Sequence, residues 1–100
     1  MRRLKHPTRR NIKLTEVLYA LSDPLRLAIV RKLARLGEHT CGACDRSIPK
    51  STLSHHFKVL RETGIIRTRM QGTRCISSLR VEDLEARFTG LLKAILHNTR

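Results

Sequence analysis

Hydrophobic residues in the middle of the chain recur at the spacing of a helix. Within residues 51–63, Leu53, Phe57 and Leu60 stand at positions i, i+4 and i+7, which places them on one face. Gly64 follows at once, and glycine commonly ends a helix. We therefore predict an amphipathic helix that buries this face. Its opposite, polar face is then either solvated or available to bind another molecule.

Two more helices are predicted towards the N-terminus. The first runs from about residue 12 to residue 21. The second begins after Ser22 or Asp23, either of which can cap it, and Pro24 suits its first helical position. It ends at Gly37. The hydrophobic stripes are Leu14, Val17, Leu18 and Leu21 in the first helix and Leu25, Ile29, Leu33 and Leu36 in the second.

Residues 38–50 connect these helices to the helix of residues 51–63 and contain little hydrophobic material. Within this connection we expect a short helical turn over residues 41–46 and a break over residues 47–50. A short helix, a tight turn and a longer helix with a polar outer face together make a helix-turn-helix.

Beyond residue 64 the hydrophobic spacing falls from that of a helix to that of a strand. Arg67 and Arg69 alternate with Ile66, Thr68 and Met70. The segment QGTR then supplies a turn, and CISSL returns as a second strand. This pattern predicts a two-stranded hairpin with a basic rim, which has to pack on helices because an isolated hairpin is marginally stable.

A last helix is predicted from near Glu82 to the C-terminal residues. Glu82, Asp83 and Glu85 fall in its first turn, where the helix dipole favours acidic side chains. Its hydrophobic stripe is wider than a thin core requires, which indicates a subunit interface. The stripe consists of Leu84, Phe88, Leu91, Leu92, Ile95 and Leu96.

The net charge of the chain indicates that this small helical domain binds a polyanion. The 100 residues include 21 Lys and Arg against 8 Asp and Glu, a formal net charge of +13. Such an excess repels itself unless a polyanion neutralises it. Nucleic acid is the leading candidate and an anionic membrane surface the second. Helix caps and strand alternation specify a globular fold, which disfavours a membrane-surface peptide, and the longest hydrophobic stretches fall far short of the roughly 20 residues of a membrane helix.

The length fits one domain, in which residues 1–10 form a basic and flexible N-terminal arm and residues 11–100 the folded part. The arm is either a solvated tail or a segment that contacts phosphates or a partner subunit. No hydrophobic segment of signal-peptide type follows the basic N-terminal residues, and three cysteines are an odd number. Both features favour a protein of the reducing cytoplasm over a secreted protein with a disulfide framework.

The polar face of the helix of residues 51–63 has the chemistry to read DNA. Small hydrogen-bonding side chains near the start of such a helix reach base edges when it enters the major groove, and cations beside them hold phosphates. The predicted base-reading residues are Ser51, Thr52, Ser54 and His55. The predicted phosphate-binding residues are Lys50, Lys58 and Arg61 of the helix and Arg67, Arg69, Arg74 and Gln71 of the hairpin, which would lie along phosphates or the minor groove.

The segments ALSDPLRLAIVRKL, STLSHHFKVLRETGII and QGTRCISSL together resemble the ArsR-type winged-helix repressors, over roughly residues 14–97. The resemblance implies a mainly α fold with a two-stranded β-hairpin, a winged helix-turn-helix. It also implies a cytoplasmic homodimer formed through the first and last helices. Such a dimer binds a palindromic operator in double-stranded DNA and represses transcription, often until a metal or an oxidant releases it.

Three cysteines are candidates for such a response. Cys41 and Cys44 form a CxxC pair that can bind a soft metal ion or form a redox couple, and Cys75 or a histidine could add a ligand. The pair resembles the family's C-V-C-D motif, but it lies three or four residues nearer the DNA-reading helix. The alternative is a pair of small, half-buried cysteines in a short helix. Asp83 and His97 are far apart in the last helix, so the family's Asp–His zinc site is not expected there.

Three classes of function remain to be compared. A sequence-specific transcriptional repressor explains the small polar residues that begin the helix of residues 51–63. A non-specific architectural DNA-binding protein is the alternative, but phosphate binding alone needs no such residues. A Cys–His hydrolase is disfavoured, because the chain lacks an acid–base constellation. His55 and His56 are adjacent and face different ways on a helix, so they suit DNA contact or packing better than a shared metal ion.

Overall fold

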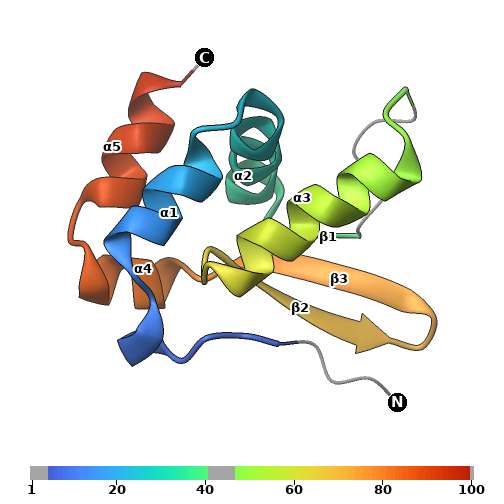
Figure 1. Cartoon of the computed structure of the whole chain (residues 1–100), viewed down its shortest axis with the longest axis horizontal. Coiled ribbons are helices and arrows are strands. Elements are labelled where there is room, and N and C mark those ends of the chain that lie inside the picture. Colours follow the sequence, from blue (N-terminus) through green and yellow to red (C-terminus); the bar gives the residue numbers. More distant parts are fainter. Residues whose placement is uncertain (1–4, 41–46, 100) are drawn as a thin grey trace.

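The computed structural model describes residues 5–40 and 47–99. Within these ranges, helices pack at one end and along one side of a three-stranded antiparallel sheet (Figure 1). The elements are a 3-10 helix, η1 (Arg9–Asn11), followed by α1 (Leu14–Leu21), α2 (Pro24–Leu36), β1 (Glu38–Thr40), α3 (Lys50–Glu62), β2 (Ile66–Gln71), β3 (Arg74–Leu79), α4 (Val81–Arg87) and α5 (Leu91–Asn98). The predicted helical turn over residues 41–46 lies outside the described residues.

The predicted start and end of α2 are confirmed. The carboxylate of Asp23 accepts hydrogen bonds from the backbone N–H groups of Leu25 (2.8 Å) and Arg26 (3.0 Å), and Pro24 occupies the first helical position. These bonds satisfy two amides that have no partner within the helix. At the other end Gly37 has a φ of +82°, which glycine adopts without strain.

The amphipathic helix α3 is confirmed, and its buried face is the predicted one. Leu53, Phe57 and Leu60 are buried, the last of them completely. After the helix, Gly64 has a φ of +89°, and a Cβ atom placed there would lie 2.5 Å from Cγ1 of Ile12. Gly64 is therefore required twice, by its backbone conformation and by the close approach of Ile12.

The core is small and, apart from Phe57, aliphatic, and the buried positions of its helices differ in detail from the predicted hydrophobic stripes. In α2 the buried positions are Arg26, Ile29, Val30 and Leu33, whereas Leu36 is 48% exposed. A charged residue thus occupies the first position of the buried stripe. In α1, Leu14 and Leu18 belong to the predicted hydrophobic stripe, and they are 43% and 46% exposed in the single chain. The remaining α1 stripe residues, Val17 and Leu21, are buried.

The hairpin is confirmed, and a third strand joins it. In the hairpin, β2 and β3 pair from Ile66 opposite Leu79 to Gln71 opposite Arg74. The sequence did not predict β1, which pairs with β3 through Glu38 opposite Ser78 and places β3 in the centre of the sheet. A three-residue strand carries too little alternation to be recognised, because its partner comes from a distant part of the chain. The order β1-β3-β2 leaves β2 at an edge.

The prediction of one continuous last helix is wrong. The chain forms α4 and α5 with a break at Gly90, which has a φ of +81°. The backbone N–H of Gly90 donates to both carboxylate oxygens of Glu85 at 3.2 Å, which stabilises the break. Both pieces still contribute to the core, through Leu84 of α4 and Leu92 of α5.

Residues 6–9 make hydrogen bonds to the hairpin and to α4. Nε2 of His6 accepts from the backbone N–H of Thr68 (2.9 Å), and the carbonyl of Pro7 accepts from Nη1 of Arg80 (2.7 Å). The flexibility expected for the N-terminal arm of residues 1–10 stays a prediction. None of the helices in the described ranges has the length and hydrophobicity that a membrane crossing requires.

Replacing Asp23 with Ala should lower the free energy of unfolding by about 1 kcal/mol, because two amides at the start of α2 lose their acceptor. Urea denaturation followed by circular dichroism measures this. The Asp23→Asn variant is the matched control, since its side-chain oxygen still accepts, and it should retain most of the stability. Equal losses in both variants would show that the hydrogen bonds are not the cause.

Candidate nucleic-acid interface

The predicted base-reading residues lie on the exposed face of α3. The burial of Leu53, Phe57 and Leu60 fixes the rotation of the helix about its axis, so its polar side chains face outward. Their hydroxyl and imidazole groups can donate and accept hydrogen bonds at base edges. The exposed residues of this face are Lys50, Ser51, Thr52, Ser54, His55 and Lys58.

Arg61 differs from the other predicted phosphate-binding residues because it is only half-exposed. Its buried Nε atom has no hydrogen-bond partner among the residues that the structure describes. A buried donor without a partner costs free energy, so the position of Arg61 is less favourable than that of a fully solvated cation. Its role at a phosphate stays a prediction.

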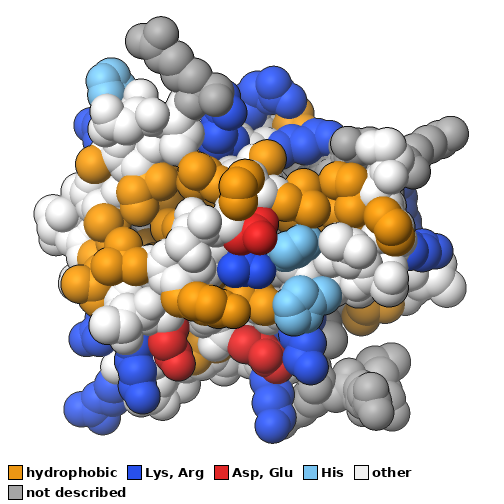
Figure 2. Space-filling model, turned by 45° about the horizontal axis from the view of Figure 1, so that its top comes forward, with side chains coloured by type: hydrophobic (Ala, Val, Ile, Leu, Met, Phe, Trp, Pro, Cys, Tyr) orange, Lys and Arg blue, Asp and Glu red, His pale blue; other side chains and the backbone are white. Residues whose placement is uncertain are grey.

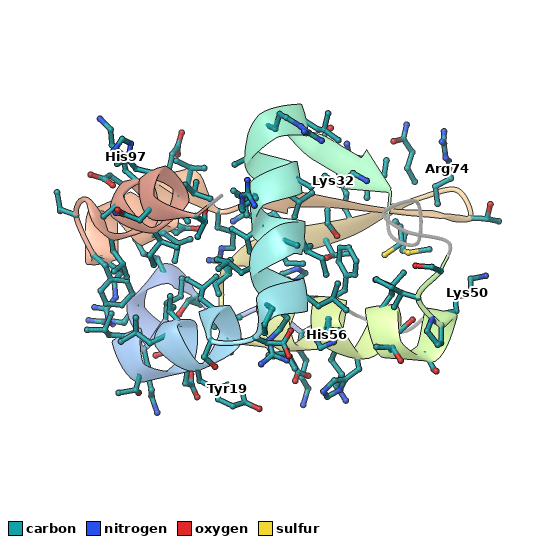
Figure 3. The ribbon with its side chains drawn as sticks, turned by 90° about the horizontal axis from the view of Figure 1, so that it is seen from above. Tyr19, Lys32, Lys50, His56, Arg74 and His97 are labelled. Carbon is teal, nitrogen blue, oxygen red and sulfur yellow. The ribbon has the colours of Figure 1, made fainter. Side chains whose placement is uncertain are left out.

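A buried arginine that the sequence did not single out holds α3 in place. Arg26 is 6% exposed; its Nε donates to the carbonyl of Ala20 (2.7 Å), and its Nη1 donates to Nδ1 of His56 (3.2 Å). Because arginine only donates, Nδ1 of His56 is the acceptor. The guanidinium also lies 5.3 Å from the ring centre of Tyr19. Figure 3 shows His56 of α3 beside the first turn of α2. Of the two adjacent histidines, therefore, His56 packs and His55 is exposed.

The sequence does contain a signal for the burial of Arg26. This residue lies three, four and seven positions before Ile29, Val30 and Leu33, so it shares the buried face of its helix. A cation in a hydrophobic stripe needs hydrogen-bond acceptors, because burying an unpaired charge is costly. The sequence does not identify those acceptors.

The β2–β3 hairpin, hereafter the wing, presents its predicted DNA-binding side chains, three arginines and Gln71, to solvent. Arg67, Arg69, Gln71 and Arg74 are all exposed. Two of them pair with acids: Nη2 of Arg69 donates to both carboxylate oxygens of Glu38 (3.1 and 3.0 Å), and Nη2 of Arg67 lies 3.5 Å from Oδ2 of Asp83. The pair of Arg69 with Glu38 is exposed on both sides and worth little in water, so a phosphate can replace that carboxylate. Arg67 is 60% exposed and its contact with Asp83 is long, so its guanidinium can also bind a phosphate.

The first residue of α3 and the tip of the wing lie towards the same end of the molecule. In Figure 3, Lys50 and Arg74 occupy one end and His97 of α5 the other. Figure 1 agrees, because the start of α3 and the wing tip both lie on the right of the view and α5 on the left. A helix with exposed hydrogen-bonding groups and a cationic hairpin can thus contact one elongated polyanion together.

Asp83 connects α4, the base of the wing and the N-terminal segment. Its carboxylate accepts from Nε of Arg9 (2.6 Å) and Nε of Arg80 (2.8 Å). The hydrogen bond from Arg9, above all, and then the one from Arg80 hold the pKa of Asp83 below its usual value, although burial opposes this shift. Asp23 likewise has a lowered pKa, chiefly because its carboxylate accepts from the N–H of Arg26. Both carboxylates are held in their charged form.

The metal or redox role predicted for Cys41, Cys44 and Cys75 stays a prediction. Cys41 and Cys44 lie outside the described residues. Cys75 is half-buried in β3. Thr40, the last described residue before Cys41, pairs with Ile76, which follows Cys75 in the chain. Among residues 5–40 and 47–99, no cluster of three or more His, Cys, Asp or Glu residues is arranged to hold a metal ion.

Comparison with known proteins identifies relatives of this fold. A family model described as a helix-turn-helix domain matches residues 21–69. The uncharacterized HTH-type transcriptional regulator YceK of Bacillus subtilis is 39% identical over 83 residues, which cover 80% of this chain and 83% of that protein. The arsenical resistance operon repressor of Escherichia coli is 45% identical over 56 residues, which cover 52% of this chain and 46% of the repressor. The crystal structure of an ArsR family transcriptional regulator superposes with a TM-score of 0.68 at 28% identity, covering 87% of this chain and 98% of that one.

Replacing Asp83 with Asn should lower the free energy of unfolding at neutral pH by about 1–2 kcal/mol, because two hydrogen bonds from arginines lose their charged acceptor. A carboxylate with a lowered folded-state pKa stabilises the fold above the ordinary Asp pKa of about 4, and this contribution disappears as the pH falls through the lowered value. The variant should therefore lose less stability than the wild type on acidification below about pH 4.

Urea denaturation at a series of pH values measures this difference. Glu82→Gln, an exposed acid one position earlier in α4, is the matched control and should change the stability little. An Asp83→Asn variant with the pH profile of the wild type would show that Asp83 is not stabilised by its arginines.

Proposed function

The chain belongs to the ArsR-type winged helix-turn-helix transcriptional regulators, which bind DNA, and from this we propose that it is a sequence-specific repressor acting as a cytoplasmic homodimer on a palindromic operator. In this proposal α3 enters the major groove. Its N-terminal side chains read base edges, while the wing lies along the backbone. The relative from Escherichia coli is named as a repressor, which supports the direction of regulation.

One observation carries the base-reading proposal: α3 buries its hydrophobic face and leaves short polar side chains exposed on the other. Ser51, Thr52, Ser54 and His55 are all exposed in the first half of the helix. Short uncharged side chains add little to purely electrostatic binding, because its affinity comes from Lys and Arg side chains that neutralise phosphates and release counterions at any sequence. Their presence therefore favours a regulator that selects a site over an architectural DNA-binding protein.

The dimer proposal rests on hydrophobic side chains that the single chain leaves uncovered. On α1, Leu14, Leu18 and Tyr19 are 43%, 46% and 62% exposed, and on α5, Leu91 and Ile95 are half-buried. Figure 2 shows hydrophobic side chains gathered on the left of its view, where α1 and α5 lie. Exposed hydrophobic area of this kind is typical of interfaces between subunits. A two-fold axis there would place two copies of α3 in successive major grooves, about 34 Å apart.

Replacing Ser54 and His55 with Ala should reduce the preference for the operator over random DNA, because each lost base contact removes about 1–3 kcal/mol of discrimination. Replacing Arg67 or Arg69 with Ala should weaken binding to both kinds of DNA and lower the salt dependence by about one unit of slope for each contact. Fluorescence anisotropy with an operator selected from random DNA, titrated at several salt concentrations, separates these effects.

The double variant Ser54→Ala/His55→Ala is compared with Arg67→Ala at equal protein stability. A uniform loss of affinity from both, with unchanged operator preference, would contradict the base-reading role of α3. A wild-type protein that binds random DNA as tightly as the selected site would instead favour the architectural alternative.

Replacing Leu18 with Glu should convert the dimer to a monomer and weaken operator binding by roughly a hundredfold or more, because the two half-sites would no longer be bound as one unit. Analytical ultracentrifugation measures the oligomeric state, and anisotropy measures the affinity. Leu36→Glu is the matched control, since Leu36 is 48% exposed at the end of α2, outside the proposed interface. Dimers that persist in Leu18→Glu would place the interface elsewhere.

A further inference from the structure

The N-terminal segment lies on the open edge of the wing. Because β3 is central, the outer side of β2 has no neighbouring strand among the residues that the structure describes. There the backbone N–H of Thr68 donates to Nε2 of His6 at 2.9 Å. An imidazole thus occupies a position where a further strand would otherwise bond.

Two further contacts fix the direction of the segment. Arg9 pairs with Asp83 of α4, and Pro7 accepts from the buried side chain of Arg80, which lies between β3 and α4. His6 then reaches the third residue of β2. From residue 9 to residue 6, therefore, the chain runs from α4 towards the wing. Figure 1 shows this course, with the segment passing beneath β2.

The segment also lies beside the end of α3. Lys5, His6 and Pro7 line a shallow cavity of about 370 Å³ together with Glu62, the last residue of that helix. Lys5 is exposed, and the described residues 5–13 contain four Lys or Arg and no acid. The segment is thus a cationic stretch held between the two elements proposed to contact DNA.

We propose that this segment is a third phosphate-binding element, beside α3 and the wing. Lys5 contacts the phosphate directly, and His6 holds the segment against the wing. The partner of the segment is the sugar–phosphate backbone of the duplex flanking the wing contact. The inference rests on the proposed DNA-binding function and adds to it a contact that the helix-turn-helix and the wing do not supply. A solvated tail would not need three anchoring contacts, one of them to an arginine whose side chain is 4% exposed.

The test compares single substitutions on either side of the anchors, in the full chain bound to a selected operator. Lys5→Gln should weaken binding and lower the slope of log affinity against log salt by about 0.9, the value for one phosphate contact. Arg10→Gln removes the same charge from an exposed position of the same segment, beyond the anchors in η1. It should leave the slope unchanged.

The positioning role of His6 is tested by combining variants. His6→Ala should reduce the slope as Lys5→Gln does, and the double variant should lose no more slope than either single one, because both remove the same contact. His6→Gln, whose side-chain oxygen can accept from Thr68, should recover part of the slope. Urea denaturation of each variant separates this loss from a loss of stability.

Equal slope changes in Lys5→Gln and Arg10→Gln would overturn the proposal, because they would reflect net charge alone. Additive losses in the double variant, or a His6→Ala loss explained by its stability, would also overturn it. A wild type that prefers no DNA sequence would refute the proposed repressor function instead. In that case the same slopes, measured on random duplex DNA, still decide the role of the segment.

Discussion

The orientation of α3 depends on the burial of Leu53, Phe57 and Leu60 in the core. Burying each of these side chains contributes roughly 1.5–3 kcal/mol, which is far more than a single surface contact. Their burial therefore fixes the rotation of the helix about its axis. Everything proposed for its outer face follows from that rotation. The close contact between Gly64 and Ile12 then fixes where the helix ends and the wing begins.

Electrostatics organises the rest of the surface around a few carboxylates. In a chain of net charge +13, Glu38 and Asp83 hold Arg69, Arg67 and Arg9 on the sheet and beside α4. The pair of Arg69 with Glu38 is exposed on both sides and therefore weak, whereas Asp83 is only 14% exposed and holds Arg9 in place. Free protein and bound protein would then use Arg69 with different partners, the carboxylate of Glu38 in one state and a phosphate in the other.

The contacts that anchor α3 and the N-terminal segment were beyond sequence-based prediction, and the reason is the same in each case. Arg26 meets His56 thirty residues away, and His6 meets Thr68 across sixty-two. No local spacing encodes such pairs. The same holds for β1, whose three residues become a strand only because β3 lies beside them. The break at Gly90 could have been predicted, because a glycine inside a helical pattern disfavours a continuous helix. The wide hydrophobic stripe of residues 84–96 favoured one instead.

The sequence by itself determined the elements whose cause is local. Periodicity placed α2, α3 and the hairpin, Asp23 and Gly37 bounded α2, and the polar face of α3 followed from its hydrophobic one. Tertiary structure alone decided which cations pair with which acids, which of the two adjacent histidines packs against Arg26, and where the N-terminal segment lies. Local patterns depend on backbone geometry over a few consecutive residues. These partners, in contrast, depend on the packing of segments that lie far apart in the sequence.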